Sequence, residues 1–230
     1  MLQVKKLNQY YGESHTLWDT MLEVRPGRCT VLMGRNGVGK TTLLKTIMGL
    51  LPAESGQVLF DGTELLTLPA HQRALKGIGY VPQGRDIFSQ MTVEENLQVG
   101  LSVKGESDEV PALVYELFPV LRQMLKRRGG DLSGGQQQQL AIGRALTLKP
   151  KLLILDEPTE GIQPNIVHHI GDVIQRLTRE ENITVLLVEQ KLPFARRVGQ
   201  YFTILDRGRS VAAAEMPALD EALVQKYLTV

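Results

Sequence analysis

The chain has 230 residues, with 26 basic and 25 acidic side chains. This balance gives no bulk attraction to nucleic acid or to an anionic lipid surface, and the length allows a sizeable core in one or two domains. The single cysteine, Cys29, excludes an internal disulfide and fits a reducing compartment. No stretch approaches the roughly 20 apolar residues of a membrane span, and the N-terminus lacks a signal peptide. We therefore expect a soluble, cytoplasmic protein.

The first third of the chain has the alternation of antiparallel strands. We expect strands at 2–4 and 21–24, separated by a polar loop over residues 8–19. Two adjacent tyrosines, Tyr10 and Tyr11, lie in that expected loop. From the residues alone, packing at a rim is a commoner role for such a pair than ligand binding.

A glycine-rich segment follows an apolar run at 29–33 and precedes a helical pattern that begins near Lys40. Strand, glycine loop and helix are the context of a phosphate-binding loop, whose backbone amides and helix N-terminus face the phosphates. Lys40 can then reach the β- and γ-phosphates, and the Thr41 hydroxyl can hold Mg²⁺. A chance match has odds of about one in a hundred in a chain of this length. The predicted nucleoside triphosphate site comprises Gly34, Arg35, Asn36, Gly37, Val38, Gly39, Lys40, Thr41 and Thr42.

The middle of the chain changes from strands at 57–60 and 78–81 to a mostly helical pattern over 84–150. We interpret 84–150 as a helical insertion in an α/β core, within a single domain over residues 1–230. Its expected features are a capping box at Thr92 to Glu95, a polar loop at 105–108 and a helix broken at Pro119.

The last third alternates between strands and helices, and only a parallel α/β class fits this pattern. Asp156 and Glu157 follow the aliphatic run 152–155, at the sheet edge where open α/β sheets bind ligands. The Asp can hold the hydration shell of Mg²⁺, and the Glu can orient and deprotonate a water molecule. The alternative, a solvated turn, is disfavoured by the four aliphatic residues before the pair. We expect strands at 152–155, 184–188 and 201–205, helices at 166–177 and 192–198, and a short C-terminal helix.

A second helix start lies about twenty residues before that pair. Ser133 and Gln136 have the spacing of a capping box, and Gly134 and Gly135 leave the first amides of the helix bare. A hydroxyl, free amides and a helix dipole form an anion site. Alone, the motif would favour a simple cap. Together with one phosphate loop and one catalytic carboxylate, it indicates a site shared between two protomers.

Over essentially its whole length the chain resembles the nucleotide-binding subunits of ATP-binding-cassette (ABC) transporters. The resemblance implies that 34–42 is the Walker A loop, 152–157 is Walker B, and 132–136 is the signature that completes the ATP site of the opposite protomer. It therefore implies ATP and Mg²⁺ as cofactors. By the same resemblance Gln83 touches Mg²⁺ and water and heads the segment that receives the membrane subunit. Tyr11 matches the aromatic residue that stacks on adenine, which replaces the rim interpretation.

Two departures from the family pattern matter. Gln190 stands where most members have a switch histidine; it can donate to the γ-phosphate but cannot change charge, which leaves Glu157 as the base. Gln163 stands where an aspartate is common after Walker B. Both features resemble the ATPases of branched-chain amino-acid importers. Within that group three segments resemble the ATP-binding subunit of urea importers most: 9–12, 34–39 and 160–164.

The expected function is therefore an ATP-hydrolysing subunit that powers an importer for urea, or alternatively for branched-chain amino acids or a related amide. Its expected partners are a second ATP-binding subunit, equal or related, arranged head to tail; transmembrane permease subunits; and indirectly an extracytoplasmic binding protein. The protein would then lie on the inner face of the membrane. A different class is an idle nucleotide clamp. Cassette ATPases of DNA repair or translation are disfavoured, because the chain has no long coiled coil, second cassette or basic stripe.

Two groups of residues stay outside this scheme. Ile87 and Phe88 follow Gln83 and either dock a cytoplasmic helix of the permease or belong to the core. The histidines lack metal-ligand spacing and are expected on the surface: His15, His71, His168 and His169.

Overall fold

The computed structural model describes residues 1–102 and 109–229, so the polar loop expected at 105–108 lies outside the described residues. The strands are β1 (Leu2–Tyr11), β2 (Ser14–Val24), β3 (Cys29–Met33), β4 (Ser55–Phe60), β5 (Thr63–Glu64), β6 (Ile78–Val81), β7 (Leu152–Asp156), β8 (Thr184–Val188), β9 (Tyr201–Asp206) and β10 (Arg209–Glu215). They form a four-stranded sheet in the order β2-β1-β4-β5 and a six-stranded sheet in the order β10-β9-β3-β8-β7-β6. The fold class is the expected one, an antiparallel β part joined to a mostly parallel core sheet.

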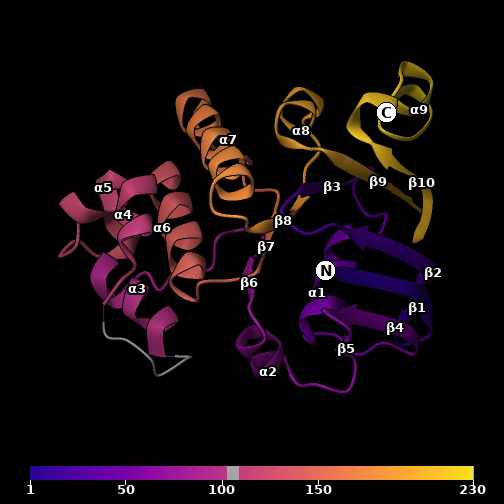
Figure 1. The fold of residues 1–230 in the computed structure, drawn as a ribbon, viewed down its shortest axis with the longest axis horizontal. Helices are drawn as coiled ribbons and strands as arrows, with labels where there is room; N and C mark the ends of the chain where they lie inside the picture. The colour runs from indigo at the N-terminus through magenta and orange to yellow at the C-terminus, as the bar shows by residue number, and fades with distance from the viewer. Residues whose placement is uncertain (103–108, 230) are drawn as a thin grey trace.

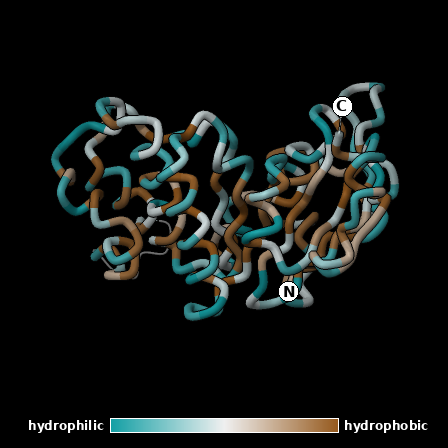
Figure 2. The backbone as a smooth tube through the Cα atoms, turned by 90° about the horizontal axis from the view of Figure 1, so that it is seen from above, coloured by the Kyte–Doolittle hydropathy of each residue, from teal (hydrophilic) through white to brown (hydrophobic). Residues whose placement is uncertain are grey.

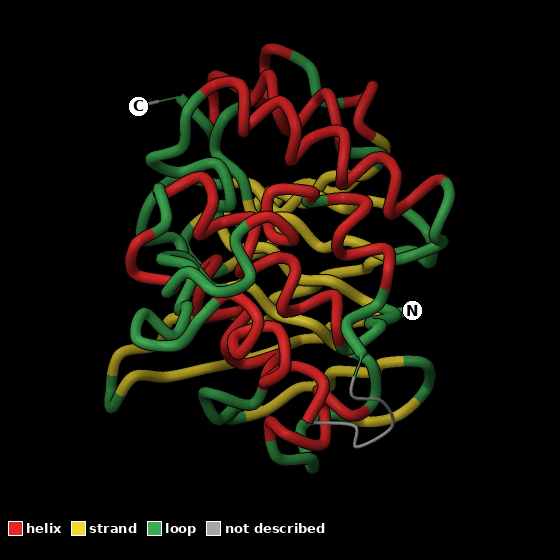
Figure 3. The backbone as a smooth tube through the Cα atoms, turned by 90° about the vertical axis from the view of Figure 1, so that its left-hand side faces the viewer, coloured by secondary structure: helices red, strands yellow, loops and turns green. Residues whose placement is uncertain are grey.

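Helices cover the six-stranded sheet and also form a group at one end of the molecule, opposite the four-stranded sheet (Figure 1). Seen from that end, they stand in front of the strands (Figure 3). They are α1 (Lys40–Met48), α2 (Ala70–Leu75), α3 (Val93–Ser102), α4 (Ala112–Leu117), α5 (Pro119–Gln123), α6 (Gly134–Thr147), α7 (Pro164–Arg179), α8 (Leu192–Val198) and α9 (Glu221–Tyr227). No helix among the described residues has both the length and the apolar character to span a bilayer.

The antiparallel sheet confirms the alternation read from the first third, but the loop expected over 8–19 is wrong. β1 continues to Tyr11 and β2 begins at Ser14, so these residues form a hairpin. The two strands pair with register shifts, and both Lys6 and Asp19 have positive φ angles, of 46° and 45°. Such bulges interrupt the two-residue period, which is why the sequence pattern hid the strands.

The six-stranded sheet is parallel except for the β10–β9 pair. Every residue of β3, β7 and β8 is buried, as the unbroken aliphatic runs predict for strands covered on both faces. Along β3, Val31 packs into a core shared with α6, α7 and α8, whereas Leu32 packs into a core shared with α1 and the antiparallel sheet. Hydrophobic segments accordingly concentrate in the interior (Figure 2). The sequence did not predict strands β5 and β10, because apolar and polar residues alternate too weakly in them.

Two local predictions for the helical part are confirmed. Thr92 and Glu95 form the predicted capping box, with Glu95 N donating to Thr92 Oγ1 at 3.2 Å and Thr92 N donating to Glu95 Oε2 at 2.7 Å. The predicted break at Pro119 is also confirmed, because α4 ends at Leu117 and α5 begins at the proline.

The surface placement of the histidines is wrong for two of the four. His169 is half-buried, with Nε2 2.9 Å from the carbonyl oxygen of Leu117. His15 is half-buried between the rings of Tyr10 and Trp18, with ring centroids 4.0 and 3.5 Å away. Neighbouring aromatic and backbone groups cover these imidazoles, and sequence spacing does not reveal such neighbours.

Candidate nucleotide site

The glycine loop joins the end of β3 to the start of α1. Gly39 caps α1 in a left-handed conformation, with φ of 108° and no side-chain hydrogen bond to the first amides. These amides therefore remain free for an acceptor from outside the helix. Gly34 has φ of 146°, and a Cβ there would lie 2.3 Å from the carbonyl oxygen of Leu205. The loop can take this shape only with glycine at position 34.

Lys40 lies inside the loop and is 5% exposed. Its Nζ donates to the carbonyl oxygens of Gly34 and Arg35, both at 2.9 Å, and lies 3.8 Å from Glu157 Oε1. Burial lowers the pKa of Lys40, while the negative charge of Glu157 chiefly opposes this change. The ammonium group is thus held among oxygens at the mouth of the loop.

Thr41 and Asp156 meet at the carboxyl end of β7. Thr41 Oγ1 donates to Asp156 Oδ2 at 3.0 Å, and Asp156 is only 2% exposed. Burial raises the pKa of Asp156 to about 6, against the opposing effect of the Thr41 hydrogen bond. The second oxygen, Asp156 Oδ1, is buried without a hydrogen-bond partner among the described residues. A free buried carboxylate oxygen beside a hydroxyl fits a hard divalent cation or its water shell.

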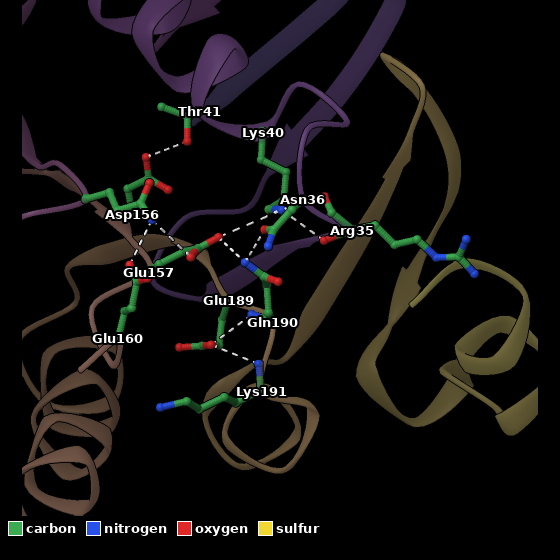
Figure 4. Close-up of polar contacts among 12 residues, drawn as sticks. Arg35, Asn36, Lys40, Thr41, Asp156, Glu157, Glu160, Glu189, Gln190 and Lys191 are labelled. Atoms are coloured by element: carbon green, nitrogen blue, oxygen red, sulfur yellow. Dashed lines mark hydrogen bonds and ion pairs between the residues drawn. The ribbon is translucent and has the colours of Figure 1, made fainter. Parts of the chain in front are cut away.

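Glu157 is held by amide groups from two other loops (Figure 4). Gln190 Nε2 donates to Glu157 Oε1 at 2.5 Å and to Asn36 Oδ1 at 2.7 Å. Gln83 Nε2 lies 3.5 Å from Glu157 Oε2 and donates to Glu160 Oε2 at 2.8 Å. Glu157 itself has a positive φ of 49°, a conformation uncommon outside glycine and asparagine. The chain therefore fixes this carboxylate from several directions.

A cavity of about 250 Å³ lies beside the glycine loop, and Asp156 and Gln190 are not among its lining residues. It joins the predicted loop, Gln83 and Glu157 in one place, and it adds Thr16 from β2, which the sequence did not single out. The lining residues are Thr16, Asn36, Gly37, Gly39, Lys40, Thr41, Thr42, Gln83 and Glu157.

Some predicted nucleotide residues have side chains elsewhere. Arg35 Nη2 donates to the carbonyl oxygens of Lys226 and Thr229 at the C-terminal end of α9, so its guanidinium points away from the cavity. Val38 packs against the core shared by α1 and the antiparallel sheet. Tyr11 ends β1, is 49% exposed and does not line the cavity. For Arg35 and Val38, only the backbone is available to bind phosphate.

The second predicted anion site lies at the N-terminus of α6. Ser133 N donates to Gln136 Oε1 at 2.9 Å and Gln136 N donates to Ser133 Oγ at 3.4 Å, which is the predicted capping box. The Arg85 guanidinium lies beside Gly134, and Ile166 of α7 packs beside Gly135. No residue of this segment lines the cavity at the glycine loop. Within one chain, the two helix N-termini do not share a pocket.

Ile87 and Phe88 have different environments. Ile87 packs against the helical core, whereas Phe88 is 45% exposed, with the Arg144 guanidinium carbon 5.0 Å from its ring centre. Ile87 therefore belongs to the core, which was one of the two expected roles, and of this pair Phe88 remains available on the surface.

Besides Thr16, sequence reasoning missed two polar side chains near the site: Glu160, already described, and Glu189. Glu189 is 2% exposed and accepts hydrogen bonds from Thr159 and from its own loop. One signal could have identified Glu189, namely an acidic residue placed directly after the aliphatic run 185–188. Glu160 carries no such signal, because its partner Gln83 comes from a distant segment.

Comparison with known proteins gives a consistent result. Residues 17–160 match the family model described as ABC transporter. The chain is 44% identical to the high-affinity branched-chain amino acid transport ATP-binding protein BraG of Pseudomonas aeruginosa, over 92% of this chain and 91% of BraG. It is 40% identical to the probable branched-chain amino acid transport ATP-binding protein LivF of Archaeoglobus fulgidus, over 91% of this chain and 89% of LivF.

Solved structures agree in fold. A nucleotide-free ATP-binding cassette from an ABC transporter superposes with a TM-score of 0.83 at 27% identity, covering 99% of this chain and 94% of that one. The dimeric post-hydrolysis cassette MJ0796, bound to ADP and Pi, has a TM-score of 0.85 at 24% identity, covering 94% of this chain and 99% of that one.

Proposed function

We infer that this chain, which belongs to the ABC transporter family, hydrolyses ATP as the ATP-binding subunit of an importer. The observation that carries the proposal is the placement of Glu157. Its carboxylate lies 3.8 Å from Lys40 Nζ and is fixed by the Gln190 amide at the wall of the cavity beside the glycine loop. A carboxylate in that place can accept a proton from water that attacks a phosphoryl group held by the loop.

Each of the other residues has a binding task in this scheme. The free amides of residues 34–42 and the Lys40 ammonium hold the phosphates. Thr41, Gln83 and Asp156 are the groups that would hold Mg²⁺, and the unpartnered Asp156 Oδ1 supports this assignment. When bound, Mg²⁺ supplies positive charge that stabilises the phosphate oxygens. Gln190 donates a neutral hydrogen bond toward the γ-phosphate side of the site.

We further propose that the complete site needs two chains, because the N-terminus of α6 lies outside the cavity of its own chain. Ser133, Gly134, Gly135 and Gln136 then complete the ATP site of a partner subunit, equal or related, arranged head to tail. Residues 1–230 act as one cassette in this scheme, with 84–150 as the subdomain that carries this signature. The proposed stacking of adenine on Tyr11 agrees with the half-exposed position of that ring.

The partner in the membrane is proposed to be a permease, with Phe88 as a docking residue on the cytoplasmic side. The chain would then lie on the inner face of the membrane, and an extracytoplasmic binding protein would deliver cargo to the permease. The exposed Phe88 ring and its loop, which follows Gln83, support this placement. Alanine at Phe88 should abolish transport while ATP hydrolysis by the isolated subunit persists.

For the cargo, branched-chain amino acids are favoured over urea. Both relatives described above are named as branched-chain amino acid transport proteins. Urea rests only on the resemblance of the segments 9–12, 34–39 and 160–164. Cells that lack the gene should lose uptake of labelled leucine. If they instead lose uptake of labelled urea and keep that of leucine, the urea alternative is correct.

The hydrolysis itself is tested with Glu157→Gln in the complete complex. We expect turnover to fall by at least about a hundredfold while ATP binding is retained, because an amide cannot accept the proton. Glu180→Gln, an exposed change at the end of α7, serves as the control. Equal turnover of Glu157→Gln and the native protein would exclude Glu157 as the base. Absence of turnover in the native complex would instead leave a nucleotide clamp, in which these residues bind ATP without cleaving it.

A further inference from the structure

Glu189 has no task in the scheme above, although it is a buried acid beside the site. It follows β8, whose five residues are all aliphatic or threonine and all buried, and it is 2% exposed. A buried carboxylate is costly unless hydrogen bonds satisfy it, and an aliphatic residue would fill the same space at lower cost. The arrangement of its hydrogen bonds indicates why a carboxylate stands there.

Each oxygen of Glu189 accepts hydrogen bonds from a different loop. Figure 4 shows the bonds from the loop of Gln190 and Lys191. Oε2 accepts a hydrogen bond from Thr159 Oγ1 at 2.7 Å. Oε1 accepts from the backbone amides of Gln190 at 2.8 Å and Lys191 at 2.9 Å. Lys191 Nζ in turn donates to the Thr159 carbonyl oxygen at 2.8 Å. The carboxylate thereby joins the loop after β7 to the loop after β8.

These two loops carry the groups that meet at the site. Thr159 follows Glu157 by two residues, and Gln190 follows Glu189 directly. Across the gap, Gln190 Nε2 donates to Glu157 Oε1 at 2.5 Å. Because Gln is flexible, its amide can reach one oxygen reproducibly only if its backbone is fixed. The bond from Gln190 N to Glu189 Oε1 fixes that backbone.

We propose that Glu189 is a positioning residue for hydrolysis, which holds the Gln190 amide against Glu157 by tying the loop after β8 to Thr159. This proposal rests on the function inferred above. Glu189 does not line the cavity at the glycine loop, so it acts on kcat through Gln190 and leaves ATP affinity nearly unchanged. A carboxylate that merely stabilised the fold would not affect the hydrolysis rate through Gln190.

The test uses the complete complex and single-turnover hydrolysis, which resolves slow rates. Glu189→Leu, similar in size but without acceptors, should lower the hydrolysis rate about 10- to 30-fold with the Kd for ATP changed by less than about threefold. Glu189→Gln should restore most of the rate, because its amide can still accept from the backbone and contact Thr159 Oγ1. Thr159→Val, which removes one donor and keeps the shape, should give a smaller loss of about 3- to 10-fold.

The decisive measurement is a double-mutant cycle with Gln190→Ala. If Glu189 acts through Gln190, adding Glu189→Leu to Gln190→Ala should lower the rate by less than about twofold. An equal loss in both backgrounds would overturn the proposal, and so would an unchanged rate in Glu189→Leu. If Glu189→Leu does not fold, Thr159→Val enters the same cycle. Failure of the underlying function would look different, since Glu157→Gln would then keep full turnover.

Discussion

The helix N-termini of α1 and α6 both have adjacent glycines, and they differ in whether a side chain already caps their first amides. At α1, Gly39 caps the helix without a side chain, and the free amides face a cavity that also holds Lys40 and Glu157. At α6, Ser133 and Gln136 already satisfy each other across the first turn. The N-terminus of α1 with the glycine loop, here called the open cradle, has free amides beside Lys40 and Glu157. The N-terminus of α6 is capped and has no residue in that cavity.

The two helix N-termini therefore bind an anion on different terms. An anion at α1 gains amides that have no side-chain partner, so binding there requires only the chain itself. An anion at α6 must share or displace the bond from Gln136 N to Ser133 Oγ, which at 3.4 Å is long and weak. The second terminus therefore suits a ligand already held elsewhere, such as ATP bound to another subunit.

The largest expected effect tests the open cradle. Gly34→Ala should weaken ATP binding at least about a hundredfold, because a Cβ at φ of 146° would lie 2.3 Å from the Leu205 carbonyl oxygen. Gly62→Ala, in the turn between β4 and β5, is the matched control: its φ is 80°, a Cβ there would meet nothing within 4 Å, and it does not line the cavity. The control should keep the Kd for ATP within about threefold, because its backbone strain lies in a turn away from the cavity. Fluorescent-nucleotide titration measures both, and equal losses would show that the close approach does not shape the cradle.

The next effect tests whether α6 acts on another chain. Ser133→Ala should lower hydrolysis about 10- to 100-fold, the value of one hydrogen bond to a charged oxygen, and Lys40→Ala should abolish it. If two equal chains share their sites head to tail, mixing the two inactive variants creates heterodimers with one intact site. Activity should then recover to about a quarter of the native level in an equal mixture. No recovery in an equal mixture that forms dimers would place Ser133 and Lys40 in the same chain's site.

The sequence predicts a feature of these sites when the residues that form it are close together in the chain. The loop around Gly34 and the capping box of Ser133 and Gln136 are local features, so spacing alone located them. The contacts of Gln190 with Asn36 and Glu157 could not be predicted, because they join loops after β3, β7 and β8 that only the parallel sheet brings together. The same holds for the Glu189–Thr159 pair.

The direction of a side chain was equally beyond the sequence. Gly34 and Arg35 are adjacent in one motif, yet the backbone of Gly34 packs against the Leu205 carbonyl group while the side chain of Arg35 points toward α9. The hairpin of β1 and β2 was missed for a related reason, since bulges at Lys6 and Asp19 shift the faces to which its residues point.

A smaller effect concerns the protonation of Asp156 at the open cradle. Without Mg²⁺ and nucleotide, burial raises the pKa of Asp156 to about 6 from an ordinary value of 3.8. Because the folded state favours the protonated acid, its stabilising contribution is complete below about pH 4 and is lost as the pH rises through 6. In EDTA, the native chain should therefore lose up to about 3 kcal/mol relative to Asp156→Asn between pH 4 and 7. Denaturant unfolding at several pH values measures this, and parallel pH profiles would contradict it.

The smallest expected effect separates backbone from side chain within the cradle. Arg35→Ala should leave the Kd for ATP within about threefold, because the guanidinium points away from the cavity and donates to the carbonyl oxygens of Lys226 and Thr229. Losing those bonds should lower the free energy of unfolding by about 1 kcal/mol, since they hold the end of α9 against the loop. Arg179→Ala, an exposed change at the end of α7, should alter neither quantity. A large loss of ATP affinity in Arg35→Ala would mean that the side chain turns into the cradle when nucleotide binds.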